Sequence, residues 1–128
     1  MTQPAALGAG QSVVTCTDGI IGTPCAFSPT GTPIAWLWNT PSVSSSSLCS
    51  TNVLINGIGA VRLGDIMAAH PDGAPCTPSP IPHTPALSTG SATVFVNGRP
   101  MGRVGDLYNT GTAFVHTIST GSPNVLVG

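Results

Sequence analysis

Residues 53–65 read VLINGIGAVRLGD, and residues 94–106 read VFVNGRPMGRVGD. In each stretch apolar residues alternate before an Asn-Gly pair, and a second apolar stretch ends at Gly-Asp. The alternation indicates a half-buried strand, and Asn-Gly favours a two-residue hairpin turn because both residues tolerate positive φ. Each stretch therefore predicts a β-hairpin that ends in a Gly-Asp corner, and their agreement indicates an internal repeat.

Two further segments resemble parts of this unit. Residues 120–127 (TGSPNVLV) match residues 89–96 (TGSATVFV), and residues 12–19 (SVVTCTDG) match more faintly. An ordinary meander sheet with chance similarity is the alternative. We therefore expect a single domain over residues 1–128, with repeat units at about 50–65, 91–106 and 120–128, a faint unit at 12–20 and a loop insertion at 22–50.

The composition excludes several classes of protein. Only 5% of the 128 residues are charged, against about 25% in ordinary globular proteins. Three basic residues are too few to neutralise a phosphate backbone, which excludes nucleic acid as a partner. The 16 Gly and 13 Pro disfavour a helical bundle, whereas 41% hydrophobic residues argue against a disordered chain. A turn-rich, all-β domain remains.

Neither a membrane-spanning helix nor a secretory leader is expected. No apolar run approaches the roughly 18 residues that a transmembrane helix needs. Residues 1–11 lack both a positively charged region and an apolar core, so we expect no Sec-type signal peptide. If the protein leaves the cell, other machinery must carry it.

Two long connections lie outside the hairpins. Residues 22–50 contain several Thr-Pro or Pro-Thr steps and a run of four Ser, which predict an extended loop. Within it Ile34, Trp36 and Trp38 alternate with Ala35 and Leu37, which predicts one short strand with both indoles on the same face. The two indoles either anchor this loop to the core or dock on a partner. Residues 66–90 hold six Pro, too many for a central strand.

The three histidines predict a metal site. His70, His83 and His116 all follow the repeated Gly-Asp corners, and Cys76 lies between the first two. Imidazole and thiolate are preferred zinc ligands in tetrahedral sites. Three His and one Cys would complete the shell of one zinc ion, which is the arrangement of a structural site. Scattered surface histidines are the alternative, and the absence of a His-x-His iron signature favours zinc over iron.

The remaining chemistry is sparse. Cys16 and Cys25 flank one turn and are the first pair to test for a disulfide, although buried free thiols are equally compatible with a chain folded in a reducing cytoplasm. The chain has no Glu, and its Asp residues are scattered. We expect no enzyme.

The equivalent acidic residues Asp65 and Asp106 have a structural role instead. Each follows Gly at a repeated corner, where Asp commonly accepts hydrogen bonds from nearby backbone N–H groups. Arg62 and Arg103 stand three residues earlier, and we expect each to pair with the aspartate of its own corner.

The two hairpin units, the following His70 and His116, and the ending TGSPNVLV resemble the PAAR-repeat proteins. These proteins form the spike tip of type VI secretion systems, contractile phage tails and related injection systems. The resemblance implies a short conical domain of repeated β-hairpins whose base caps a trimeric spike, either VgrG-like or from a phage baseplate. It also implies one structural zinc ion, held near the apex by three His and one Cys.

The resemblance further implies a life cycle and a set of partners. Such a tip assembles in the cytoplasm, sits at the end of the tail or secretion tube, and is ejected toward the target cell, whose membrane it contacts transiently. Effector proteins are further partners. The scarcity of charge suits this passage, because a charge is costly to bury in a bilayer.

Two features depart from the family pattern. Family members often carry Cys-Gly-His after the Gly-Asp corner, whereas residues 111–116 read GTAFVH. The thiolate role therefore passes to Cys76 by position, with Cys49 as the substitute. Because the sequence stops at Gly128, we expect a bare tip with no effector domain.

Two other functions are compatible with the sequence. A small zinc hydrolase would need an open coordination position and a nearby carboxylate base, for which Asp72 is the local candidate. A disulfide-stapled secreted interaction domain would need its four cysteines oxidised.

Overall fold

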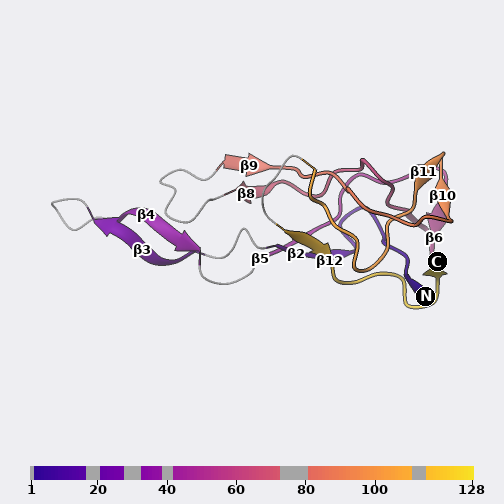
Figure 1. Ribbon diagram of the computed structural model, residues 1–128, viewed down its shortest axis with the longest axis horizontal. Helices are drawn as coiled ribbons and strands as arrows, with labels where there is room; N and C mark the ends of the chain where they lie inside the picture. Colours follow the sequence, from indigo (N-terminus) through magenta and orange to yellow (C-terminus); the bar gives the residue numbers. More distant parts are fainter. Residues whose placement is uncertain (1, 17–20, 28–32, 39–41, 73–80, 111–114) are drawn as a thin grey trace.

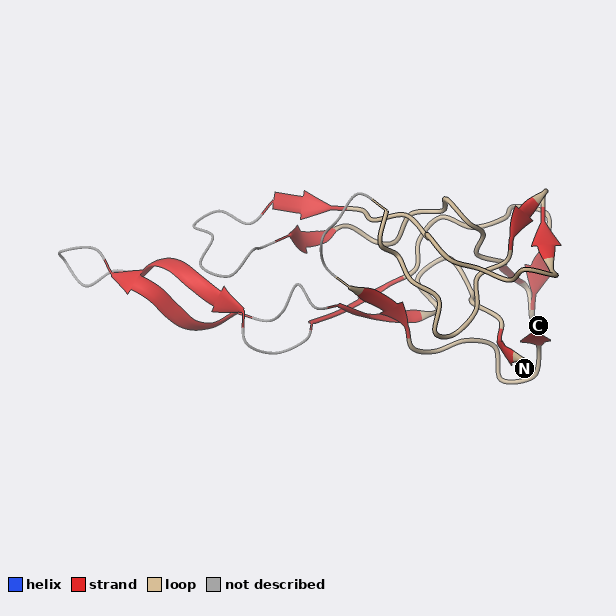
Figure 2. Ribbon diagram, viewed as in Figure 1, coloured by secondary structure: helices blue, strands red, loops and turns tan. Residues whose placement is uncertain are grey.

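The computed structural model describes residues 2–16, 21–27, 33–38, 42–72, 81–110 and 115–128. These residues form short strands and no helix, which confirms the all-β fold class. Figures 1 and 2 show an elongated molecule whose broad end carries several small hairpins and whose narrow end is a single longer hairpin. Within the described ranges, no helix is long and apolar enough to cross a membrane.

The two repeated stretches fold as the predicted hairpins at the broad end. Their turns, at residues 56–57 and 97–98, have positive φ at both positions, 54° and 82° in the first and 53° and 77° in the second. Asn and Gly adopt this region at little cost, so the turns form without strain. The four antiparallel strands are β6 (Leu54–Ile55), β7 (Ile58–Gly59), β10 (Phe95–Val96) and β11 (Arg99–Pro100).

A third hairpin is assembled from the two ends of the chain. β13 (Leu126–Val127) pairs antiparallel with β1 (Gln3–Pro4), and the register is the one that joins the strands of the other two hairpins. β13 therefore takes the place of a first strand and β1 that of a second strand. The sequence repeat at 120–128 revealed the first half of this unit, but its second half at the N-terminus carries no repeat signal.

Three backbone hydrogen bonds close a ring through the three units. The Ala6 N–H donates to Gly102 O at 3.0 Å, the Gly102 N–H to Val61 O at 2.8 Å, and the Val61 N–H to Ala6 O at 3.4 Å. Each of these residues stands at the same place after the second strand of its hairpin. The three units are thus related by an approximate threefold arrangement. We call these three hydrogen bonds the central ring.

A buried serine begins each unit. The Oγ atoms of Ser50, Ser91 and Ser122 accept the backbone N–H of the residue three positions later, at 3.0, 2.9 and 3.0 Å. The backbone N–H groups of Ser50, Ser91 and Ser122 donate to the carbonyl groups of Ala60, Met101 and Ala5, respectively. Because buried polar groups need partners, these contacts fix the same local geometry at the start of each hairpin.

The buried apolar residues form two clusters. The cluster beneath the hairpins consists of Ala5, Leu7, Ile55, Ala60, Val96, Met101 and Val127. The second cluster consists of Ala6, Val14, Val61, Met67, Leu87, Tyr108 and Ile118. Burial of apolar surface is the main driving force of folding. The first cluster takes residues from all three units, so no unit can complete its packing without the other two.

The remaining strands form three separate sheets. β2 lies between β5 and β12 in the first, β8 pairs with β9 in the second, and β3 pairs with β4 in the third. Figure 1 shows β3 and β4 at the narrow end, farthest from the three hairpins. The bounds are β2 (Val13–Cys16), β3 (Ile21–Phe27), β4 (Pro33–Trp38), β5 (Ser42–Ser45), β8 (His70–Asp72), β9 (Ile81–His83) and β12 (His116–Ile118).

These strands refine the expectations for the two long connections. In the Pro-rich connection 66–90, β8 and β9 are both edge strands, the only place in a sheet where Pro is readily accepted. Residues 22–50 contain the expected short strand at 33–38, but residues 21–27 and 42–45 are strands as well. The Pro and Ser content of that segment had predicted a loop at these two strands. Of the faint unit at 12–20, the described residues 13–16 form β2.

Tyr108 is an unusual member of the second cluster. Its side chain is fully buried, and its hydroxyl group has no hydrogen-bond partner among the described residues. Burial, reinforced by the nearby carboxylate of Asp65, raises the pKa of the Tyr108 phenol above its ordinary value. The folded protein therefore resists ionisation of this tyrosine, whereas the unfolded chain ionises normally.

This arrangement predicts an alkaline loss of stability. The free energy of unfolding should fall above about pH 10, where the unfolded but not the folded state loses the phenol proton. Tyr108→Phe should remove this fall while changing stability at neutral pH by less than about 1 kcal/mol, because the lost hydroxyl had no partner. Urea unfolding at neutral and alkaline pH measures both effects. The chain has one Tyr, so phenolate absorbance reports on this residue alone, and an identical alkaline fall in the variant would contradict the prediction.

Candidate functional site

The broad end presents one large apolar side chain from each hairpin. Leu54, Phe95 and Leu126 hold the same position, the first residue of the first strand, and they are exposed by 56%, 56% and 58%. The next residue of each strand is buried, as the alternation of a half-buried strand requires. We call this surface the base face. Val53 and Val94, which precede two of the three residues, are also exposed.

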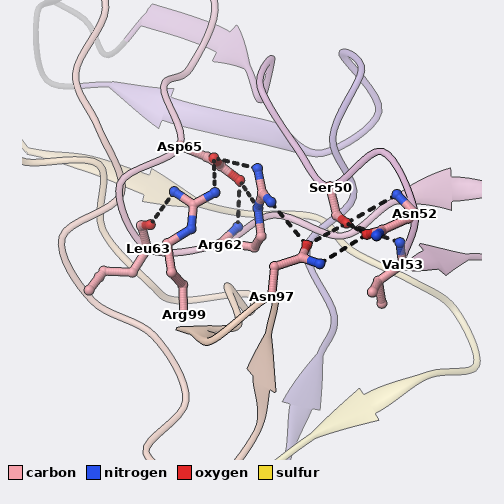
Figure 3. Close-up of polar contacts among 8 residues, drawn as sticks. All are labelled: Ser50, Asn52, Val53, Arg62, Leu63, Asp65, Asn97 and Arg99. Atoms are coloured by element: carbon pink, nitrogen blue, oxygen red, sulfur yellow. Dashed lines mark hydrogen bonds and ion pairs between the residues drawn. The ribbon is translucent and has the colours of Figure 1, made fainter.

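Side-chain hydrogen bonds tie the turn of each hairpin to the next unit. Asn97 Oδ1 accepts from Ser50 Oγ at 2.7 Å and from Arg62 Nη1 at 3.0 Å, while Asn97 Nδ2 donates to Asn52 Oδ1 at 2.9 Å (Figure 3). In the same way, Asn56 Nδ2 donates to Ser122 Oγ and to Asn124 Oδ1, both at 2.9 Å. These two acceptors lie at the start of the third unit.

In the third hairpin a backbone group replaces the turn asparagine. The carbonyl oxygen of Gly128 accepts from Ser91 Oγ and from Arg103 Nη1, the latter at 3.1 Å. These donors are the equivalents of those that bind Asn97 Oδ1 in the first interface. The three hairpins are therefore held in place by neighbouring units, and the base face is a rigid surface.

Each Gly-Asp corner is closed by an arginine–aspartate pair, as the sequence predicts. Asp65 Oδ2 accepts from the backbone N–H and from Nε of Arg62, both at 2.9 Å. Asp106 Oδ2 accepts from the same groups of Arg103 at 2.8 and 3.0 Å. The hydrogen bond to Asp106 is the main reason that the pKa of the Arg103 guanidinium is raised.

One contact at the first corner crosses between units and was not foreseen. Arg99 Nη2 lies 3.2 Å from Asp65 Oδ1, and Arg99 Nη1 donates to Leu63 O at 3.1 Å (Figure 3). Asp65 is fully buried, and the guanidinium groups of Arg62 and Arg99 both contact its carboxylate. These two arginines come from different units. No spacing in the sequence links Arg99 with Asp65, because the contact exists only once the hairpins are assembled.

The predicted histidine ligands lie on neighbouring strands. His70 of β8 is the register partner of His83 of β9. The ring centroids of His83 and His116 are 5.1 Å apart, with the ring planes tilted by 59°. His116 is fully buried at the start of β12, where Asn109 Oδ1 accepts its backbone N–H at 3.2 Å. The fold thus brings three imidazole-bearing positions, distant in sequence, into one neighbourhood between the base face and the β3–β4 hairpin.

The cysteines are placed less completely. Cys76 lies outside the described residues. Cys16, at the end of β2, is the register partner of His116. Cys49 is a free thiol packed beside Gly8 and Gly59, where an added Cβ on either glycine would collide with it. Cys49 belongs to the packing around the second cluster.

Among the side chains that the structure describes, no three His, Cys, Asp or Glu residues lie together as a metal-binding group. The side chain of His70 and residue 76 lie outside that set. The donor chemistry of the neighbourhood nevertheless suits zinc, since imidazoles from β9 and β12 are adjacent and a histidine of β8 stands opposite.

Comparison with known proteins covers most of the chain. A family model described as the PAAR motif matches residues 2–116. The chain is similar to the NAD(P)(+) glycohydrolase toxin Tse6 and to the (p)ppApp synthetase toxin Tas1, from two strains of Pseudomonas aeruginosa. It is 35% identical to each over 79 residues, which is 62% of this chain. The match covers 17% of the length of each toxin.

Proposed function

The chain belongs to the PAAR-motif family, and we propose that it is a non-enzymatic tip that caps and sharpens the trimeric central spike of a contractile injection system. It assembles on the spike in the cytoplasm and is then driven with the spike through the membrane of the target cell. The similarity to the two toxins is confined to a small part of their length, so we assign their enzymatic activities to the remainder of those proteins.

The observation that carries this proposal is the threefold equivalence of the base face. A trimeric spike ends in three identical surfaces around one axis. A single chain can match all three only if it offers the same feature three times. Leu54, Phe95 and Leu126 do so with nearly equal exposure, and their hairpins are locked to one another. Apolar side chains on a preorganised surface make a low-cost docking site, since little order is lost on binding.

The capping proposal is tested by complex formation with a trimeric spike protein from the same organism. We expect one chain per trimer, measured by light scattering of the co-purified complex. Replacing Leu54, Phe95 and Leu126 together by Ser should weaken binding by at least about 100-fold, because three central apolar anchors are lost. Leu48→Ser is the matched control, since Leu48 is also about half exposed but lies outside the three hairpins. Equal losses from the triple variant and the control would contradict the docking role of the base face.

We further propose that His70, His83 and His116 hold one structural zinc ion, with the thiolate of Cys76 as the fourth ligand. When bound, the ion would link the β8–β9 sheet to β12, which belongs to a separate sheet. Such a crosslink suits a narrow part of the molecule, where little apolar surface can be buried, because metal binding contributes directly to folding free energy. Four protein ligands leave no position for a substrate, in keeping with a structural role.

The zinc proposal is tested by metal analysis of the purified protein. We expect one zinc per chain, and chelation should lower the melting temperature by about 10 °C or more. Cys76→Ser should lose both the metal and this stability, whereas Cys49→Ser should retain the metal. Zinc lost from Cys16→Ser but retained by Cys76→Ser would move the thiolate ligand to the register partner of His116. A protein without metal, or one indifferent to chelation, would refute the site.

A further inference from the structure

The β3–β4 hairpin contributes no residue to the base face or to the proposed zinc ligands. Its two strands pair only with each other among the described strands, and the hairpin projects from the end of the molecule opposite the base face (Figures 1 and 2). The core clusters are built from the units at the broad end and the segments next to them. Its two tryptophans could either anchor the segment to the core or contact a partner. The position of the hairpin, away from both clusters, favours contact with a partner.

The hairpin has the composition of a surface that binds something neutral and apolar. Between Asp18 and Arg62 the sequence contains no Asp, Glu, Lys, Arg or His. The strands β3 and β4 read IGTPCAF and PIAWLW, in which only Gly, Thr and Pro fall outside the hydrophobic residue types. Both tryptophans of the chain, Trp36 and Trp38, lie in β4. Tryptophan favours the boundary between lipid chains and headgroups, because its ring is large and apolar but carries one polar N–H.

The edges of the hairpin are poorly suited to another protein strand. Pro24 and Pro33 each lack the N–H that a further strand would need to bond. The pairing of β3 with β4 also shifts register three times, between Ile21, Pro24, Ala26 and Phe27. Proline and bulges on edge strands are devices that prevent strand addition. A protein partner that extends the sheet is therefore disfavoured, whereas a fluid surface needs no matching strand.

We propose that the β3–β4 hairpin is a lipid-contacting arm that partitions into the interface of an electrically neutral bilayer. The arm would lie at the level of the headgroups, since a two-stranded hairpin has edge N–H and C=O groups that cannot be left unpaired in hydrocarbon. This inference deepens the proposed function and rests on it for one point only, that the end opposite the spike meets the target membrane. Absence of charge in the arm means that attraction to anionic lipid contributes nothing.

The test uses the intact chain and vesicles of phosphatidylcholine. Because both tryptophans lie in β4, intrinsic tryptophan fluorescence reports on the arm alone. We expect a blue shift on adding vesicles, quenching by brominated phosphatidylcholine, and co-flotation of the protein that is unchanged between low and high salt. Trp36→Ser, with Trp38 kept as the probe, should weaken partitioning by about tenfold, as expected when one interfacial indole is removed.

The control separates the arm from the base face. The Leu54, Phe95 and Leu126 triple Ser variant should bind vesicles normally even though it no longer binds the spike. Quenching by brominated lipid is measured on the unmodified protein, so it does not depend on any variant folding. Absence of quenching, binding only to anionic vesicles at low salt, or loss of vesicle binding in the base-face variant would each overturn the proposal. None of these results would affect spike capping.

Discussion

Replacing Asp65 by Ala is expected to lower the free energy of unfolding by about 3–5 kcal/mol, the usual cost of removing one partner from a buried ion pair. The carboxylate is fully buried and is contacted by the guanidinium groups of Arg62 and Arg99, which come from different units. Its loss removes the carboxylate that accepts the Arg62 backbone N–H and contacts both guanidinium groups. Because small domains are stable by only about 5–15 kcal/mol, this loss is a large share of the total and should lower the melting temperature markedly.

Asp106→Ala is the matched control for this prediction. Asp106 closes the equivalent corner and accepts the same groups of Arg103, but no second arginine reaches it in the part of the chain that the structure describes. Thr89 Oγ1 also donates to Asp106 Oδ1, at 3.0 Å. We expect a smaller loss, about 1.5–3 kcal/mol, typical of hydrogen bonds to a charged group. Urea unfolding followed by circular dichroism compares the two. Equal losses would mean that the contact between units through Arg99 adds nothing to stability.

The local parts of this architecture could be predicted from sequence because each depends on a few adjacent residues. Asn-Gly at 56–57 and 97–98 determines both hairpin turns through the φ values that these residues tolerate. The pairing of Asp65 with Arg62 follows from a spacing of three across a tight corner. In both cases the interacting groups are so near in sequence that the backbone leaves few alternative partners.

The contacts between units could not be predicted in the same way. The N-terminal segment completes the third unit, yet it contains no Asn-Gly and no Gly-Asp. At its corner the Leu7 N–H donates to Ser12 Oγ at 2.8 Å, so a serine fills the role that aspartate has at the other two corners. The third unit therefore keeps the hydrogen bonds of the repeat although its residue types differ. Contacts such as Arg99 with Asp65 likewise depend on assembled geometry.

The histidine neighbourhood lies between these two cases. The sequence placed His70, His83 and His116 beyond the same corners, and the structure puts them on neighbouring strands. The sequence could not indicate that Cys16 is the register partner of His116, because this pairing joins β2 to β12, which are far apart in the chain. Cys16 therefore became a candidate thiolate ligand only once the register of the strands was known.

Deleting residues 1–8 should abolish folding altogether. The segment supplies β1, one of the three members of the central ring, and the buried residues Ala5, Ala6 and Leu7. Both apolar clusters lose members, so the cost is not confined to one hairpin. The deleted protein should show no cooperative thermal or urea transition and should lack the dispersed amide signals of a folded chain. A cooperative transition in this variant would show that the central ring is dispensable.

A circular permutant distinguishes the missing segment from mere disturbance of a chain end. Val127 can be joined to Gln3 through an added Asn-Gly pair, which copies the connection that residues 56–57 make between β6 and β7, and new ends can be opened at residues 56–57. All three hairpins keep their strands and register in this molecule; only the identity of the unclosed hairpin changes. Closing and opening short loops of equal length changes chain entropy little, so cooperative folding should be retained. If the permutant failed to fold, the third hairpin could not be the equivalent of the other two, and the threefold base face would lose its structural basis.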